Sequence, residues 1–175
     1  MSILDQVFDR LALDLYGAEP EVKERLSALG NAASGKEIIK RMNNAHWAMC
    51  FLTKAGMPQQ DAVEIACRCA EEMLPLSGNS YLCQECIAAA RSWLADHSRD
   101  NKRLALQAGI RCRDSTVPFH DKRWSLLCVD AVLVPNCWTT LIDTGKDRFK
   151  MPSYIQMCQK RLTKKIVNYL EEKEM

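Results

Sequence analysis

The stretch that decides the fold is residues 79–97, NSYLCQECIAAARSWLADH. Its apolar residues recur at three-and-four spacing, which predicts an amphipathic helix whose cap is Asn79 or Ser80. The expected inner face comprises Cys83, Cys86, Ile87, Ala90, Trp93 and Leu94. The C-x-x-C pair of Cys83 and Cys86 therefore belongs to the predicted buried face of a helix.

The same periodicity continues in both directions along the chain. Glycine, proline and serine at the junctions, among them Ser98 as a helix cap, divide the sequence into eight or nine expected helices. These cover about residues 3–16, 20–29, 35–55, 58–75, 80–97, 98–115, 119–134 and 153–173. No alternating apolar run flanked by hairpin turns predicts a strand. We therefore expect an all-α fold, either a compact multi-helix bundle or stacked helical pairs.

The length of 175 residues fits a single helical domain over residues 1–175, large enough to bury a core without disulfides or metals. Within it, residues 1–30 could form an N-terminal helical appendage, and residues 146–175 hold a basic C-terminal helix. An apolar content of 47% and a charged content of 26% are typical of a globular protein.

The N-terminal residues predict neither export nor membrane insertion. The stretch MSILDQVFDR carries two aspartates and no long apolar core, and the chain has no run of 18 apolar residues. We therefore expect a cytoplasmic protein. Its nine cysteines, an odd number, are predicted to be reduced core residues.

Charge is distributed unevenly along the chain. Residues 1–100 carry a balance of −4 and residues 101–175 a balance of +6. The basic half could meet an acidic protein, a phosphate-bearing ligand or nucleic acid. Nucleic acid is the weaker alternative, because the basic face of the last helix has no aromatic platform for stacking bases.

Residues 30–37, GNAASGKE, match the spacing of a phosphate-binding loop except that Glu37 replaces the required Ser or Thr. The preceding segment is helical, whereas that motif follows a buried strand. A helix end at Gly30 and a cap at Ser34 explain the stretch better, with anion binding at the helix start as the alternative.

Two sets of residues could serve metal or thiol chemistry. Cys83 and Cys86 form the C-x-x-C pair, and His46 and Cys50 lie four residues apart on one helix face. Their place on smooth amphipathic helices favours core packing, so we expect no metal and no cofactor. An enzyme dependent on a metal or a thiol remains an alternative.

Aromatic and basic residues of the second half could together bind a ligand or partner, by stacking a ring and pairing with a carboxylate or phosphate. The candidates are Trp93, Trp124, Trp138, Arg91, Arg111, Arg123 and His120. The alternative interpretation is that the tryptophans fill the core and the arginines cover its rim.

The segment 85–97, ECIAAARSWLADH, and the following RLALQA at 103–108 resemble the immunity protein family of bacterial polymorphic toxin systems and the immunity-like domains of phage proteins. The resemblance covers about residues 60–134. It implies an all-helical binding protein that acts by occlusion or sequestration, in the cytoplasm of a bacterium or of a phage-infected host.

The first hypothesis is therefore a non-enzymatic protein that neutralises a toxin or defence factor by covering its active or interaction surface. The second is a small-molecule binder, such as a sponge for a nucleotide signal, that uses the Trp/Arg groups. The third is the metal- or thiol-dependent enzyme.

Overall fold

The computed structural model is helical wherever it assigns regular structure. It describes residues 39–40, 44–54, 56–135, 137 and 153–173. Within these residues lie six α-helices, one 3₁₀ helix and no strand. They are α4 (Ala45–Lys54), α5 (Gln59–Met73), η2 (Leu74–Ser77), α6 (Tyr81–Ala95), α7 (Arg99–Arg113), α8 (Phe119–Leu133) and α10 (Ser153–Glu172). The all-α prediction is confirmed.

The predicted count of eight or nine helices is not supported by the described residues, which supply six α-helices. The helices expected over residues 3–16 and 20–29, the appendage 1–30 and the stretch 30–37 lie outside them. No helix in the described part of the chain is both long and apolar enough to cross a membrane.

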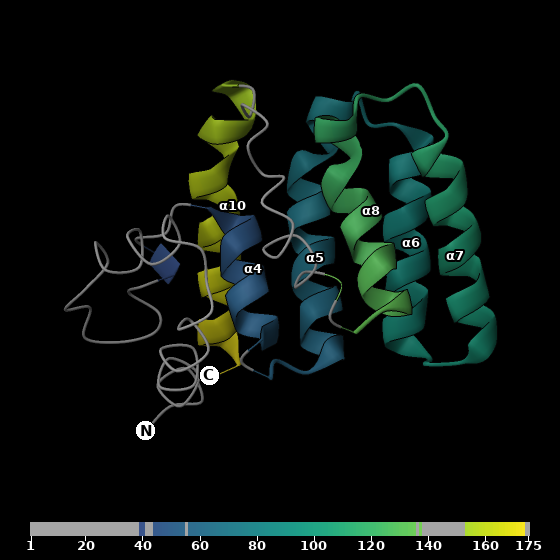
Figure 1. The fold of residues 1–175 in the computed structure, drawn as a ribbon, viewed down its shortest axis with the longest axis horizontal. Coiled ribbons are helices and arrows are strands. Elements are labelled where there is room, and N and C mark those ends of the chain that lie inside the picture. The colour runs from purple at the N-terminus through teal and green to yellow at the C-terminus, as the bar shows by residue number, and fades with distance from the viewer. Residues whose placement is uncertain (1–38, 41–43, 55, 136, 138–152, 174–175) are drawn as a thin grey trace, which may run out of the picture.

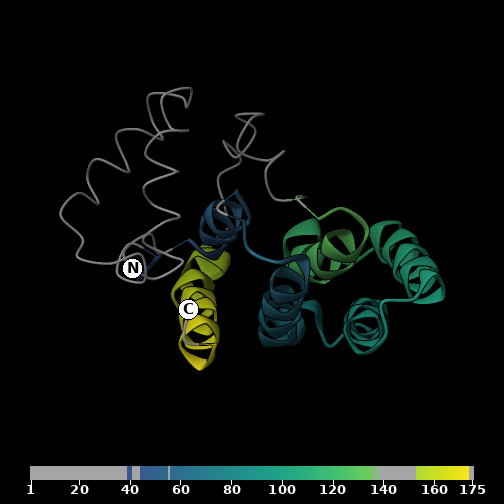
Figure 2. The ribbon, with the colours of Figure 1, turned by 90° about the horizontal axis from the view of Figure 1, so that it is seen from below.

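The helices lie in two layers. Consecutive helices from α5 to α8 run antiparallel, with their connections at alternate ends of the bundle (Figure 1). Seen from below, α4, α8 and α7 form one layer and α10, α5 and α6 form the other (Figure 2). Helix α5 packs against α4, α6, α8 and α10, whereas α7 packs against α6 and α8. Helix α5 is thus the centre of the bundle and α7 its edge.

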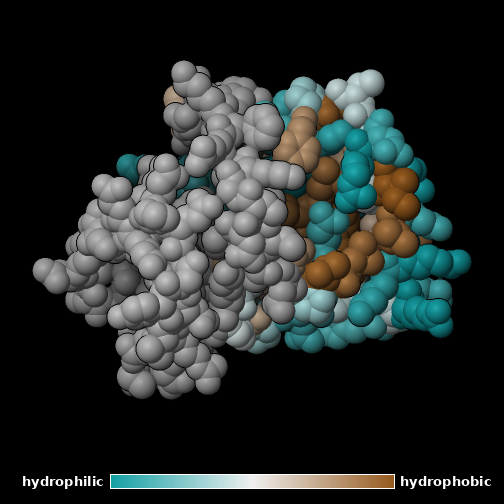
Figure 3. Space-filling view, in the orientation of Figure 1, coloured by the Kyte–Doolittle hydropathy of each residue, from teal (hydrophilic) through white to brown (hydrophobic). Residues whose placement is uncertain are grey.

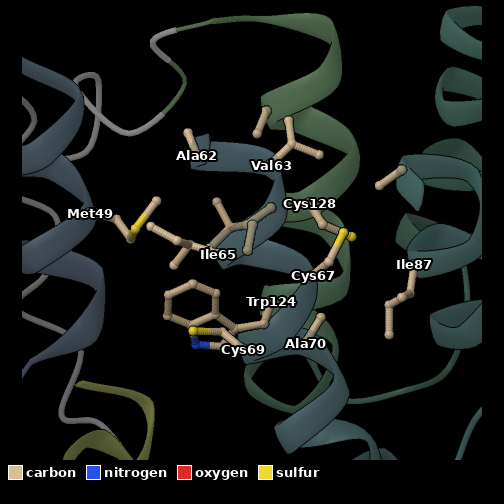
Figure 4. Packing of buried hydrophobic residues seen from close by; sticks show 14 of the residues in the cluster. Met49, Ala62, Val63, Ile65, Cys67, Cys69, Ala70, Ile87, Trp124 and Cys128 are labelled. Carbon is tan, nitrogen blue, oxygen red and sulfur yellow. The ribbon is translucent and has the colours of Figure 1, made fainter. Parts of the chain in front are cut away.

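The central position of α5 explains why cysteines on its two opposite sides are both buried. Cys67 and Cys69 are about 200° apart around a helix axis, yet both are fully buried. Cys67 faces α8, where its sulfur lies beside that of Cys128 (Figure 4). Cys69 lies on the side of α10, near Lys165. Both sides of α5 are therefore covered by other helices.

The helix expected over residues 35–55 is not continuous, although residues 39 and 40 are already helical. Asn44 is not helical, and α4 starts at Ala45. The amide of Ala45 donates a 2.9 Å hydrogen bond to Oε1 of Gln159 on α10, and both residues are buried. The first amide of α4 is therefore satisfied by a side chain far along the chain. A local sequence pattern could not reveal this contact.

Helix α7 turns an unusual inner face to the bundle. That face is built from Ala105, Ala108, Gly109 and Cys112. A Cβ atom at Gly109 would lie 3.1 Å from Cγ2 of Val129 on α8, so α7 and α8 approach closely there. The predicted cap at Ser98 is confirmed, because its Oγ accepts a hydrogen bond from the Asn101 amide at 3.3 Å.

Candidate functional site

The two tryptophans that the structure describes fully do not stand on the surface. Trp93 and Trp124 are each 4% exposed. Trp93 packs its ring 4.5 Å from that of His97, and the Trp124 ring projects from α8 toward α5 and α4 (Figure 4). Of the two interpretations of these tryptophans, their burial favours the one in which the large apolar rings fill the core. Trp138 lies outside the described residues.

Arg91 joins two helices instead of facing a ligand. Its guanidinium pairs with Glu64 and, at 2.9 Å, with Glu71, both on α5. Burial alone would lower the pKa of Arg91, but the hydrogen bonds that Arg91 donates to these carboxylates outweigh burial and raise that pKa. Arg68 extends the network from Glu64 to Glu172 on α10. The arrangement joins α6, α5 and α10 through two guanidiniums and three carboxylates.

The other predicted basic residues lie apart from Arg91. Arg111 on α7 makes a bidentate ion pair with Glu85 on α6, at 2.6 and 3.1 Å. His120 and Arg123 lie in the first two turns of α8 and are half-buried. The His120 ring stands edge-on to that of Phe119, with 6.0 Å between centroids. Trp93, Arg91, Arg111 and His120 therefore each have a different partner within the described residues.

The cysteines form part of the core. All nine are free thiols; seven are buried, and Cys137 and Cys158 are half-buried. Cys83 lies against Cys112, and Cys112 also lies against Cys86. Contact with Cys112 and then burial raise the pKa of Cys83. The prediction that the cysteines are core residues is confirmed for the seven buried ones.

These thiols are poorly placed for chemistry. Burial raises the pKa of Cys69, and the pKa of Cys112 rises to about 11 because contact with Cys86 and burial outweigh the opposing contact with Cys83. A thiol reacts through its thiolate, so a raised pKa and burial both suppress reactivity. His46 and Cys50 are buried on α4, and burial, followed by Arg123, lowers the pKa of His46 to about 3.

No three or more His, Cys, Asp or Glu side chains come together as a potential metal site within the described ranges.

The exposed feature that sequence reasoning missed is the outward side of α7. Leu106 and Ile110 are 46% and 47% exposed and lie one helical turn apart. Around them stand four basic residues; together the six, Arg99, Lys102, Arg103, Leu106, Ile110 and Arg113, are named the α7 outer face. Apolar side chains gather over α7 and α8 amid hydrophilic surface (Figure 3).

Helix α8 also has exposed apolar residues at its two ends. Phe119 in its first turn is 59% exposed, and Val134 at its C-terminal cap is 54% exposed. Because the inner side of α7 is filled by small residues, its larger apolar residues remain outside. The sequence signal for this face is the three-and-four spacing of residues 99, 103, 106, 110 and 113.

Comparison of the chain with family models, with curated proteins and with solved structures finds no match.

Proposed function

We propose that this protein is a non-enzymatic binding protein that holds a protein partner on the α7 outer face and neutralises it by occlusion. The observation that carries the proposal is the exposure of Leu106 and Ile110 at the centre of a basic helix face. Neighbouring exposed apolar residues rimmed by polar ones are typical of protein interaction sites.

The size of the exposed surface suits such an interface. A helix of the length of α7 extends about 22 Å, and α8 has exposed apolar residues at its two ends, Phe119 and Val134. A stable interface needs roughly 800 Å² from each partner, with apolar and arginine contacts near its centre. The α7 outer face supplies both kinds of contact.

The partner class is a toxin or a defence factor. Its support is the resemblance of residues 85–97 and 103–108 to immunity proteins, and these segments lie on α6 and α7 with their flanking residues. The immunity-type mechanism needs no catalytic group on this chain, only a surface that covers a functional region of the partner.

Site-specific photocrosslinking in producing cells tests the proposal. A photoreactive phenylalanine analogue is placed at position 106, and the matched control carries it at position 104. Leu104 and Leu106 have the same 46% exposure, but they lie about 200° apart around α7.

We expect position 106 to capture a defined protein that position 104 does not. The captured protein, once purified, should lose its own activity when this chain is added. Equal capture from both positions, or a captured protein whose activity is unchanged by binding, would contradict the proposed function.

A further inference from the structure

The α7 outer face contains a regular stripe along the helix. Arg99, Arg103, Leu106, Ile110 and Arg113 follow one another at intervals of four, three, four and three residues. This alternation is the spacing with which one helix packs along another in a coiled coil. Leu106 and Ile110 occupy the middle of the stripe, and arginines occupy both ends.

We propose that this stripe is the seam for an acidic amphipathic helix of the partner. The inference rests on the proposed function and specifies the chemistry of the binding segment. The partner helix carries apolar residues opposite Leu106 and Ile110, and Asp or Glu opposite the flanking arginines.

The arginines of the stripe are available for such pairing. Arg103 contacts Asp100 at 3.5 Å, but both side chains are more than half exposed, so water screens this ion pair strongly. Arg99 and Lys102 have no ion pair within the described part of the chain. Arg113 reaches Asp130 on α8 at 3.3 Å, and its side chain is 54% exposed. A carboxylate of the partner can therefore pair with these groups without breaking a buried contact.

A second copy of the chain does not suit this seam. In a parallel pair of α7 helices, Arg103 would face Arg103 and Arg113 would face Arg113. In an antiparallel pair centred between Leu106 and Ile110, Arg103 would face Arg113. Because like charges repel in both arrangements, the charge pattern requires a different, acidic helix.

The apolar centre of the stripe, Leu106 and Ile110, also favours a helix over a polyanion as the partner. A nucleic acid backbone would pair with the arginines but would leave Leu106 and Ile110 against phosphates, where they contribute nothing. An amphipathic helix uses both kinds of side chain, because its apolar and charged residues alternate at the same spacing.

The experiment measures the binding of labelled synthetic helices to the full chain by fluorescence anisotropy. The probe is a helical peptide of about 20 residues whose stripe reads Glu, Glu, Leu, Leu, Glu at the four–three spacing. Its control peptide has Lys in place of the three stripe Glu residues. Circular dichroism establishes that each protein variant is folded.

We expect the acidic peptide to bind the unmodified chain and the Lys peptide to bind at least about tenfold more weakly. Leu106→Ser should weaken binding of the acidic peptide about tenfold, whereas the matched Leu104→Ser variant should bind as the unmodified chain does. Arg103→Glu should weaken the acidic peptide and strengthen the Lys peptide.

Three results would overturn the inference: no binding of the acidic peptide, equal binding of both peptides, or equal effects of the two leucine variants. Duplex DNA and anionic vesicles complete the panel. The inference is also overturned if DNA or vesicles bind, if Leu106→Ser weakens that binding, and if the acidic peptide does not bind. If the acidic peptide does not bind but position 106 crosslinks a specific protein, the acidic-helix inference is wrong and the proposed function stands. If the peptide does not bind and position 106 crosslinks no specific protein, both proposals are wrong.

Discussion

Replacing Lys122 by methionine should lower the free energy of unfolding by about 3 kcal/mol. Lys122 lies on α8 and is 5% exposed, and its Nζ donates hydrogen bonds to the carbonyl oxygens of Arg113 and Ser115 at 2.8 and 2.9 Å. The Arg113 carbonyl ends α7 and that of Ser115 lies just after it, where no further amide of the helix can reach them. The ammonium group thus closes α7 and ties it to α8.

The magnitude follows from these two bonds. A hydrogen bond from a charged donor contributes about 1.5–3 kcal/mol, so two of them set an upper limit of about 6 kcal/mol. Arg113 is exposed and Ser115 half-buried, so water replaces part of what the substitution removes. About half of the limit remains, which corresponds to a fall in Tm of about 6–12 °C for a chain of this size.

The assay is urea unfolding of the full chain followed by circular dichroism. Lys102→Met is the matched control, because Lys102 is an exposed lysine on α7 and its loss should change stability by no more than about 0.5 kcal/mol. If Lys122→Met were as stable as Lys102→Met, the two carbonyls would not depend on this ammonium group and the reasoning would be refuted.

Three further predictions concern the core. The pKa of His46 is lowered from 6.5 to about 3 by burial, so the unfolded chain binds the proton first as pH falls; about 2 kcal/mol of stability should be lost between pH 7 and pH 5, and urea titrations should show a smaller loss for His46→Gln. Gly109→Ala should destabilise the fold by about 1 kcal/mol despite its better helix propensity, because the buried, β-branched Val129 has little room to move. Urea unfolding measures this cost, which should vanish in a Val129→Ala background; persistence there would exclude the proposed clash. Alkylation of the folded protein, read by mass spectrometry, should modify Cys158 before any of the seven buried thiols, and early labelling of a buried thiol would contradict their assignment to the core.

Much of the fold follows from the sequence because helix periodicity and end signals are local. The stretch 79–97 predicts α6, and Ser98 caps α7 as expected. What failed was non-local: α4 begins at Ala45 because Gln159, far along the chain, accepts the hydrogen bond of its amide. No window of neighbouring residues contains that information.

The candidate site was less predictable than the fold. Tryptophan and arginine suit both a binding surface and a core with its rim, and only packing decides between them. Trp93 is buried, and Arg91 is engaged by Glu64 and Glu71. The exposed pair Leu106 and Ile110 was overlooked because large apolar residues are ordinarily assigned to the inner face of a helix.

In α7, the residues that hold the helix in the bundle and the residues that face outward are different ones. Ala105, Ala108, Gly109 and Cys112 supply the contacts that keep α7 in place, so those positions are constrained by folding. The outward positions contribute little to these packing contacts, so folding constrains their sequence much less. Substitutions along this one strip of surface can therefore change what the helix presents while the architecture stays constant.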